Sequence, residues 1–193
     1  MDYYFYDLVN KIDKLYVSYR RRFIMARNGK IYIPKDHSTG ENLYLEKKLF
    51  VGHLSHRYAI GVFGGEKSSK FICFDVDMPD KDIVRKVVDA IAQFGFPRDR
   101  IYVSSSGGKG YHIELFFTSV VYTNLLYEFY DSIVQETGLD HRKVEFRPTS
   151  KQSIKLPLSV HPRTGNVCWY LDSKTLEPIE DPGYILSIVP LNH

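Results

Sequence analysis

Two stretches of the chain repeat apolar residues at the spacing of an amphipathic helix. Residues 81–94 and 121–137 place them three and four positions apart, and a glycine follows each stretch, so both are predicted helices. Residues 3–22 show the same spacing and predict a third helix, which ends in three arginines. Short β-prone apolar runs predict strands at residues 31–33, 58–63, 70–77, 101–103, 111–117, 144–148 and 166–171.

The order of these elements predicts the fold class. From residue 70 to residue 148 the chain reads strand, helix, strand, strand, helix, strand, which is typical of an α+β domain. Two helices then cover one face of a mainly antiparallel sheet, and the other face is free to carry a site. The glycine-rich residues 64–69 predict a hairpin that joins the strand 58–63 to the strand 70–77.

The strand 70–77 ends by presenting two carboxylates. Side chains two positions apart on a strand share a face, so Asp75 and Asp77 lie together. Two adjacent acids repel each other unless they are protonated or bind a cation, and Mg²⁺ and Mn²⁺ prefer such oxygen ligands. The alternative is that Asp77 or Asp80 only caps the following helix.

A second candidate site is the turn of residues 104–110, which is rich in serine and glycine and contains Lys109. Backbone N–H groups, hydroxyls and a lysine charge together suit phosphate binding. This is not a Walker loop, because a strand follows it where a helix would be needed, and an ordinary glycine-rich hairpin is the alternative. His112 lies just beyond, on the face of Glu114, where it could donate to a phosphate or serve only as a structural histidine.

A third group lies downstream. Glu145 is a candidate third carboxylate, although a single acid in a short strand is more often a solvated surface residue. The potential donors that follow it are Lys151, Lys155, His161 and Arg163. Three acids together with several cationic donors are what two-metal nucleotidyl transfer requires.

Taken together, these motifs resemble those of the archaeo-eukaryotic primase superfamily. The segments that carry the resemblance are Asp75-Val76-Asp77, Ser106-Gly107-Gly108-Lys109-Gly110-Tyr111-His112, and Glu145 followed by residues 154–165. The likeness is greatest to the bacterial, phage and mobile-element primase-polymerases, CRISPR-associated ones included, and to the polymerase domain of bacterial ligase D. It spans about residues 58–171.

The resemblance implies an RRM-like antiparallel catalytic core with covering helices, at residues 58–193. Residues 1–57 would form a small N-terminal αβ module packed on that core, giving one compact domain. The implied activity is that of a template-dependent nucleotidyltransferase, a DNA primase or polymerase that extends or initiates chains by two-metal phosphoryl transfer.

The resemblance also assigns roles to residues. Asp75, Asp77 and Glu145 would ligate Mg²⁺ or Mn²⁺, although many relatives have aspartate in place of Glu145. The residues expected to bind the incoming nucleotide's triphosphate are Ser106, Gly107, Lys109 and His112, assisted by Lys155 and His161. Larger replicative primases carry a zinc-binding insertion, but no cluster of cysteine and histidine here would build one, so we expect no zinc site.

Charge and composition agree with this interpretation without requiring it. The 193 residues carry a net charge of +3, which permits a polyanionic partner. The expected partners are a DNA template or primer and nucleoside triphosphates, and a helicase or another replication or mobile-element protein is a further candidate. The arginines assigned to nucleic-acid contact are Arg20, Arg21, Arg22 and Arg163, although cations at residues 20–22 would also complement a helix C-terminus.

The same sequence predicts where the protein resides. No apolar run is long enough to span a bilayer, and residues 1–5 lack the basic start and apolar core of a signal peptide. Two cysteines, Cys73 and Cys168, are too few for a disulfide framework and are expected in the core. We therefore expect a cytoplasmic protein without a membrane partner.

Two alternatives remain open at this point. A metal-dependent nuclease could use the same acids, but it has no need of the triphosphate-binding residues. A catalytically inactive subunit that binds nucleic acid or nucleotides could keep the fold and the motifs without the reaction.

Overall fold

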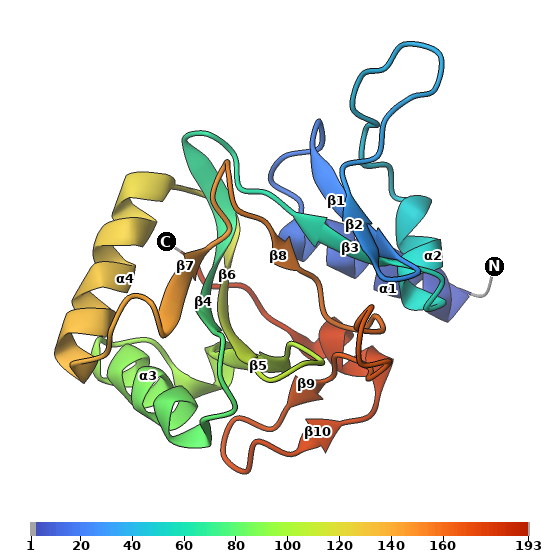
Figure 1. The fold of residues 1–193 in the computed structure, drawn as a ribbon. Coiled ribbons are helices and arrows are strands. Elements are labelled where there is room, and N and C mark those ends of the chain that lie inside the picture. Colours follow the sequence, from blue (N-terminus) through green and yellow to red (C-terminus); the bar gives the residue numbers. More distant parts are fainter. Residues whose placement is uncertain (1–2, 193) are drawn as a thin grey trace.

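The structure, a computed structural model, describes residues 3–192 and consists of two antiparallel sheets with four helices (Figure 1). Residues 1, 2 and 193, at the outer ends of the predicted 1–57 and 58–193 units, lie outside the described part. The larger sheet has the strand order β10-β9-β5-β6-β4-β7. Its strands are β4 (Ser68–Val76), β5 (Tyr102–Ser105), β6 (Tyr111–Tyr122), β7 (Val144–Arg147), β9 (Tyr170–Leu171) and β10 (Pro178–Ile179).

Two helices, α3 (Lys81–Gln93) and α4 (Thr123–Thr137), cover one face of the larger sheet. Alternate side chains of β4, those of Ile72, Phe74 and Val76, are fully buried against them. Gly138 ends α4 in the left-handed conformation, at φ +63°, which glycine adopts without strain. The predicted α+β class, with an antiparallel sheet and two covering helices, is confirmed.

The start of α3 shows which of the two candidate aspartates, Asp77 or Asp80, caps this helix. Asp80 is the N-cap residue, and its carboxylate accepts hydrogen bonds from the backbone N–H groups of Asp82 and Ile83. Asp77 has no part in this cap and stays available for another role.

A smaller sheet and helix α1 (Tyr3–Tyr16) lie over the opposite face of the larger sheet (Figure 1). The smaller sheet has the order β2-β1-β3-β8. The remaining elements are β1 (Phe23–Arg27), β2 (Lys30–Tyr32), α2 (Leu49–Leu54), β3 (Ala59–Val62), β8 (Ile154–Lys155) and the 3₁₀ turns η1 (Arg98–Arg100) and η2 (Pro182–Ser187). Tyr16 of α1 packs edge-on against Phe71 and Phe116, so one apolar core joins α1 to the large sheet.

The predicted hairpin between residues 58–63 and 70–77 is wrong. Strand β3 pairs with β1 and β8, and β4 pairs with β6 and β7. All four residues of β3 are buried, so this strand suits the interior of a sheet, and the glycines that follow it carry the chain across to the other sheet. The smaller sheet thus takes strands from both sides of the predicted boundary at residue 58; the division into two units itself stays a prediction.

Two other predicted elements are shorter than expected. Helix α1 ends at Tyr16, so the three arginines at residues 20–22 follow it in irregular backbone and do not form its last turn. The predicted strand 166–171 is reduced to β9, preceded by an isolated bridge between Val160 and Val167. Within residues 3–192, none of the helices has the length and apolar character that crossing a membrane requires.

We expect Tyr16→Phe to destabilise the fold by about 1–3 kcal/mol, because it leaves a buried carboxyl oxygen without its donor. The Tyr16 hydroxyl lies 2.9 Å from Oε2 of Glu114 and 2.8 Å from the Tyr170 hydroxyl. Urea unfolding measures the change. Tyr6→Phe, at a site 53% exposed, is the matched control and should shift the free energy of unfolding by less than about 0.5 kcal/mol; equal effects of the two variants would contradict the assignment.

Candidate active site

The candidate site lies in the cleft between the two sheets. A pocket of about 260 Å³ is walled on one side by β1, β2 and β3 and on the other by the large sheet. Six of the residues predicted from the sequence line it, namely Asp75, Asp77, Ser106, His112, Lys155 and His161. A second pocket of about 420 Å³ shares Asp77, Ser106 and His161 with the first and adds Lys109 and Arg163.

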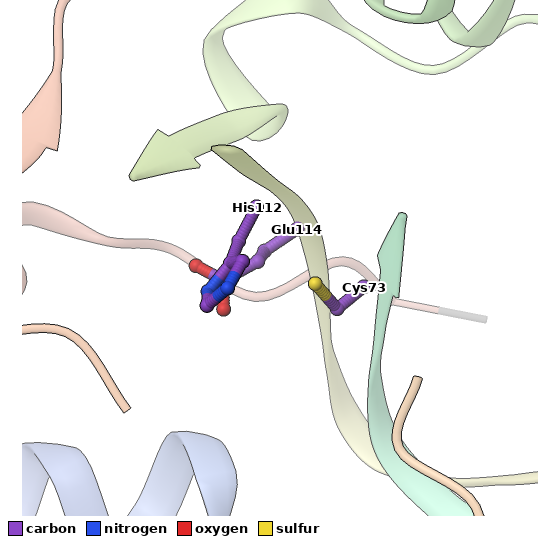
Figure 2. Close-up of side chains that lie close together, drawn as sticks. All are labelled: Cys73, His112 and Glu114. Atoms are coloured by element: carbon purple, nitrogen blue, oxygen red, sulfur yellow. The ribbon is translucent and has the colours of Figure 1, made fainter. Parts of the chain in front are cut away.

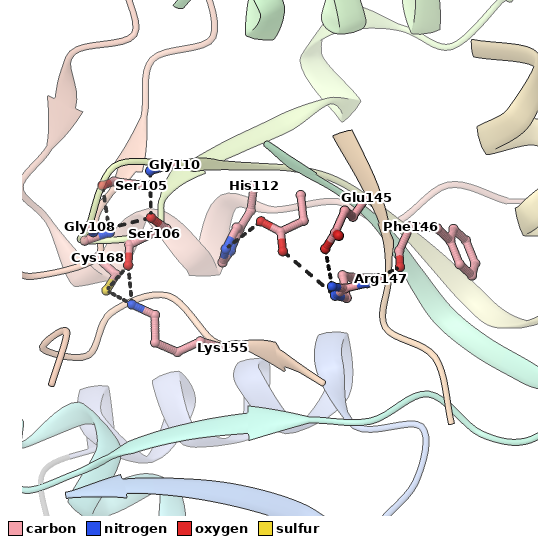
Figure 3. Close-up of polar contacts among 12 residues, drawn as sticks. Ser105, Ser106, Gly108, Gly110, His112, Glu145, Phe146, Arg147, Lys155 and Cys168 are labelled. Atoms are coloured by element: carbon pink, nitrogen blue, oxygen red, sulfur yellow. Dashed lines mark hydrogen bonds and ion pairs between the residues drawn. The ribbon is translucent and has the colours of Figure 1, made fainter. Parts of the chain in front are cut away.

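Strand pairing brings the acids together. Asp75 of β4 lies opposite Glu145 of β7 on one side and opposite His112 of β6 on the other. Residues paired across antiparallel strands point to the same face, so all three face the cleft. Figure 3 shows the side chains of His112 and Glu145 in this arrangement. Nε2 of His112 lies 3.7 Å from Oδ1 of Asp75. Asp77 follows one residue after the end of β4 and is exposed.

Arg147, which the sequence analysis did not single out, is the counter-ion of this group. Its guanidinium hydrogen-bonds to Oε2 of Glu145, and its Nε lies 3.9 Å from Oδ2 of Asp75. Its position two residues after Glu145 on the same strand was the available signal, because it places both side chains on one face.

Burial and like charges act on Asp75 in the same direction. Burial raises the pKa of Asp75 to about 6; Arg147 opposes this shift, whereas Asp77 and Glu145 add to it. A carboxylate in this position is stabilised by a cation. Hard divalent ions prefer oxygen ligands, so the three acids fit Mg²⁺ or Mn²⁺ by donor type.

The loop of residues 106–110 is held in shape by its own serines. The N–H groups of Gly108 and Gly110 donate to Oγ of Ser106, at 3.3 and 3.0 Å, and the N–H of Gly107 donates to Oγ of Ser105 at 3.0 Å. These N–H groups are therefore already engaged, which differs from the expected backbone cradle for phosphate. The groups that this loop offers to a phosphate are the exposed Lys109 ammonium and the serine hydroxyls.

Two glycines let this loop approach its neighbours. Gly107 has φ +73°, and a Cβ there would lie 2.7 Å from Sγ of Cys168 and 2.8 Å from Cβ of His161. At Gly110 a Cβ would collide with the carbonyl oxygen of Val76, at the end of β4. The predicted Gly107 thus shapes the loop by close packing, and the loop abuts the strand that carries the acids.

Lys155 and His161 fix the loop from the other side of the cleft. The Lys155 ammonium donates to the carbonyl oxygen of Ser106 and lies 2.7 Å from Sγ of Cys168 (Figure 3). Nδ1 of His161 accepts from the N–H of Thr164 at 3.2 Å. Burial and the Lys155 charge lower the pKa of His161, so this ring is neutral near pH 7.

A buried polar group lies beneath the acids. Cys73, His112 and Glu114 each offer an atom within 4.8 Å of the others (Figure 2), and the expectation of no zinc site stays a prediction. Within residues 3–192, Oε1 of Glu114 and Nδ1 of His112 have no hydrogen-bond partner. Burial raises the pKa of Glu114 to about 8 and lowers the pKa of His112 to about 3, so both side chains are uncharged at neutral pH. Both cysteines are buried, as predicted.

The arginines predicted to contact nucleic acid fall into two groups. Arg20 lies 2.7 Å from the buried Asp13, and the Arg22 guanidinium lies 4.2 Å from the centre of the Phe63 ring. Both therefore have partners within the protein. Arg21 and Arg163 are exposed, and Arg163 lines the 420 Å³ pocket.

The fold is that of the AEP domains of primase-polymerases. The solved structure of the cyanophage S-2L primase-polymerase (PrimPol), AEP domain, is similar to this chain, with a TM-score of 0.51 over 95% of this chain and 93% of that one. At 20% identity this likeness concerns the fold alone.

The family follows from the sequence. Residues 13–192 match the family described as the archaeo-eukaryotic primase domain of TOTE conflict systems. The chain belongs to this family, which confirms the resemblance drawn from the three motifs. The members of this superfamily are nucleotidyltransferases of the primase and polymerase type. A comparison with curated proteins gave no match.

Glu114→Gln should reveal the raised carboxyl pKa as a pH dependence of stability. Between the ordinary value of 4.5 and the folded value of about 8, the folded chain keeps a proton that the unfolded chain has lost, so wild-type stability falls as pH rises. Glutamine does not titrate, so wild type should lose stability relative to the variant by up to about 1.4 kcal/mol per pH unit in this range.

Urea unfolding of both proteins from pH 5 to pH 8 measures this difference. Asp75 titrates in the same range and its charge adds to the raised pKa of Glu114, but it is present in both proteins, so the difference between them reports the Glu114 carboxyl together with its coupling to Asp75. A difference that stays constant with pH would contradict the assignment.

Proposed function

We propose that this chain is a template-dependent nucleotidyltransferase that adds nucleotides to a 3′-hydroxyl and uses Mg²⁺ or Mn²⁺. The observation that carries the proposal is the position of Asp75, which is paired with His112 on one side and Glu145 on the other. Asp75 also lines a pocket together with Asp77 and Ser106 of the serine-glycine loop. One face of one sheet thus presents the carboxylates next to the phosphate-binding donors.

The acids and the arginine have complementary roles in the proposal. The oxygens of Asp75, Asp77 and Glu145 would hold the divalent ions, which supply the positive charge that the attacking oxygen and the leaving pyrophosphate require. Arg147 neutralises Asp75 and Glu145 and keeps two like charges close together on adjacent strands.

The triphosphate would lie on the loop side of Asp77. The 420 Å³ pocket places Lys109 and Arg163 next to Asp77, with Ser106 and His161 in the wall. Cations and hydroxyls of this kind neutralise a polyphosphate through charge-assisted hydrogen bonds. A nuclease has no need of this subsite, so the subsite favours nucleotidyl transfer over cleavage.

The partners of the proposed reaction are a DNA template with its primer and nucleoside triphosphates. A helicase or another replication or mobile-element protein is proposed only on the family resemblance. Of the proposed nucleic-acid contacts, Arg21 and Arg163 are exposed, and Arg163 also lines the pocket proposed for the triphosphate.

We expect wild type to extend a labelled primer on a DNA template with Mn²⁺ or Mg²⁺, and Asp75→Asn/Asp77→Asn to reduce extension by at least about 100-fold. The reason is that loss of groups that only support metal ligands already costs roughly 10- to 100-fold. Asp7→Asn, at an exposed position of α1, is the control and should leave extension unchanged.

Gel analysis of the same reactions separates the alternatives. Shortened DNA that depends on the two aspartates would indicate a nuclease. Binding of DNA without any extension, under either ion and with either deoxyribo- or ribonucleotides, would indicate an inactive binding subunit. Products on an unprimed template would establish priming.

Lys109→Ala should weaken binding of a nucleoside triphosphate by roughly 10-fold or more, since a charged hydrogen bond contributes about 1.5–3 kcal/mol. The affinity is measured by titrating the triphosphate into the protein in the presence of Mn²⁺ and recording the rise in Tm. Lys86→Ala removes another exposed lysine, from α3, and is the control. Equal affinity of the two variants would place the triphosphate elsewhere.

A further inference from the structure

A group of buried polar side chains lies beneath the acids, on the cleft face of the large sheet. Cross-strand pairing places Ser104 of β5 beside His112 of β6, and Tyr170 of β9 beside Ser104. Glu114 lies two positions beyond His112 on the same strand, so the two side chains share a face. Ser104 and Glu114 are fully buried, and His112 is 4% exposed.

Three polar atoms of this group have no hydrogen-bond partner within residues 3–192. They are Oγ of Ser104, Nδ1 of His112 and Oε1 of Glu114. Buried polar atoms are nearly always paired in folded proteins, so three of them at neighbouring positions indicate a shared link. A ring nitrogen of His112 and a carboxyl oxygen of Glu114 lie within 4.8 Å of each other, and Figure 2 shows the two side chains next to each other. A direct hydrogen bond, or two bonds through one water molecule, spans such a distance.

Two tyrosines fix the other end of the Glu114 carboxyl. The Tyr16 hydroxyl donates to Oε2 of Glu114 at 2.9 Å and lies 2.8 Å from the Tyr170 hydroxyl. A hydroxyl carries a single hydrogen, so Tyr170 is the donor in the bond between the two tyrosines. Because Oε2 of Glu114 is an acceptor, a proton on this carboxyl belongs on Oε1.

That proton requires an acceptor. Burial raises the pKa of Glu114 to about 8, so the carboxyl keeps its proton at neutral pH. A neutral imidazole has one N–H group and one acceptor nitrogen. When Nδ1 of His112 is the acceptor, the ring hydrogen is on Nε2, which lies 3.7 Å from Oδ1 of Asp75. The opposite tautomer would turn a lone pair toward Asp75 and leave the Oε1 proton without an acceptor.

We propose that Glu114 is a positioning residue that accepts from Tyr16, donates to Nδ1 of His112 directly or through one water molecule, and so fixes His112 as the Nε2–H tautomer. The ring then presents a hydrogen-bond donor to the cleft. The role of that donor rests on the function proposed above, in which its acceptor is a phosphate oxygen of the nucleoside triphosphate. Glu114 itself is fully buried and acts only through His112.

The tautomer is measured by NMR without catalysis. Long-range ¹H–¹⁵N spectra of ¹⁵N-labelled protein distinguish a protonated ring nitrogen from an unprotonated one, and His112→Asn identifies the His112 signals by their loss. Wild type and Glu114→Gln should both show a protonated Nε2, because a glutamine amide supplies the same acceptor and donor. Glu114→Met supplies neither and should show the Nδ1–H form or a mixture of the two tautomers.

Glu136→Met, at an exposed position of α4, is the matched control and should leave the His112 signals unchanged. The same His112 tautomer in wild type and in Glu114→Met would overturn the proposal, as would a Glu114→Gln spectrum that resembles that of Glu114→Met. If Glu114→Met does not fold, Glu114→Met/Tyr16→Phe takes its place, because removing both partners of a buried hydrogen bond costs less than removing one.

Kinetics test the consequence for the substrate. Glu114→Met should raise the KM for the nucleoside triphosphate by about 2- to 10-fold, the effect of one hydrogen bond, and leave the KM for primer unchanged. Glu114→Gln should behave as wild type. A purely structural defect would lower the folded fraction, and with it kcat, without changing either KM. Equal rises in both KM values would contradict the positioning role.

Metal analysis excludes a different use of the same group. An ion held by Cys73, His112 and Glu114 would occupy the ring nitrogen that the proposal assigns to Glu114. We expect wild type and Cys73→Ser to have the same metal content after purification. One equivalent of a transition metal in wild type that is lost in Cys73→Ser would overturn the proposal.

The two proposals fail in distinguishable ways. If wild type extends primers but the His112 tautomer does not depend on residue 114, the proposed function stands and the role of Glu114 is wrong. If the tautomer changes as expected while the protein neither binds a triphosphate nor extends a primer, Glu114 orients His112 and the proposed reaction is wrong.

Discussion

The pairing of β4 between β6 and β7 is the constraint on which the rest of this structure depends. Because side chains alternate along a strand, this pairing sends Ile72 and Phe74 into the core beneath the helices and turns Cys73 and Asp75 toward the cleft. A shift of one residue in this register would exchange the two sets and place a carboxylate in the apolar core. The buried apolar face of β4 therefore fixes where the site forms.

The site gathers charges that would separate in water. Burial disfavours ionised Asp75, and its acidic neighbours disfavour it further, so the group depends on compensating cations. Arg147 supplies one from within the chain, and a divalent ion would supply more. Beneath these acids the Glu114 carboxyl stays protonated and accepts a hydrogen bond from Tyr16, so it adds no further negative charge next to Asp75.

The smaller sheet completes the cleft, and its last strand comes from a distant part of the chain. Lys155 lies on β8, and its ammonium holds the loop that carries Ser106. The same segment continues to His161, which packs against Gly107. The pairing of β8 in the smaller sheet therefore also positions the loop of residues 106–110.

The sequence alone determined the helices α3 and α4, the common face of Asp75 and Asp77, and the glycine loop, because periodicity and turn chemistry are local properties. It did not determine the partner strands of β3, because all four residues of β3 are buried and lack the alternation that would identify one apolar face. It also did not predict the contact of Arg147 with Asp75 or the burial of Glu114. Strand pairing and burial depend on which distant segments meet, and only the tertiary structure decides that.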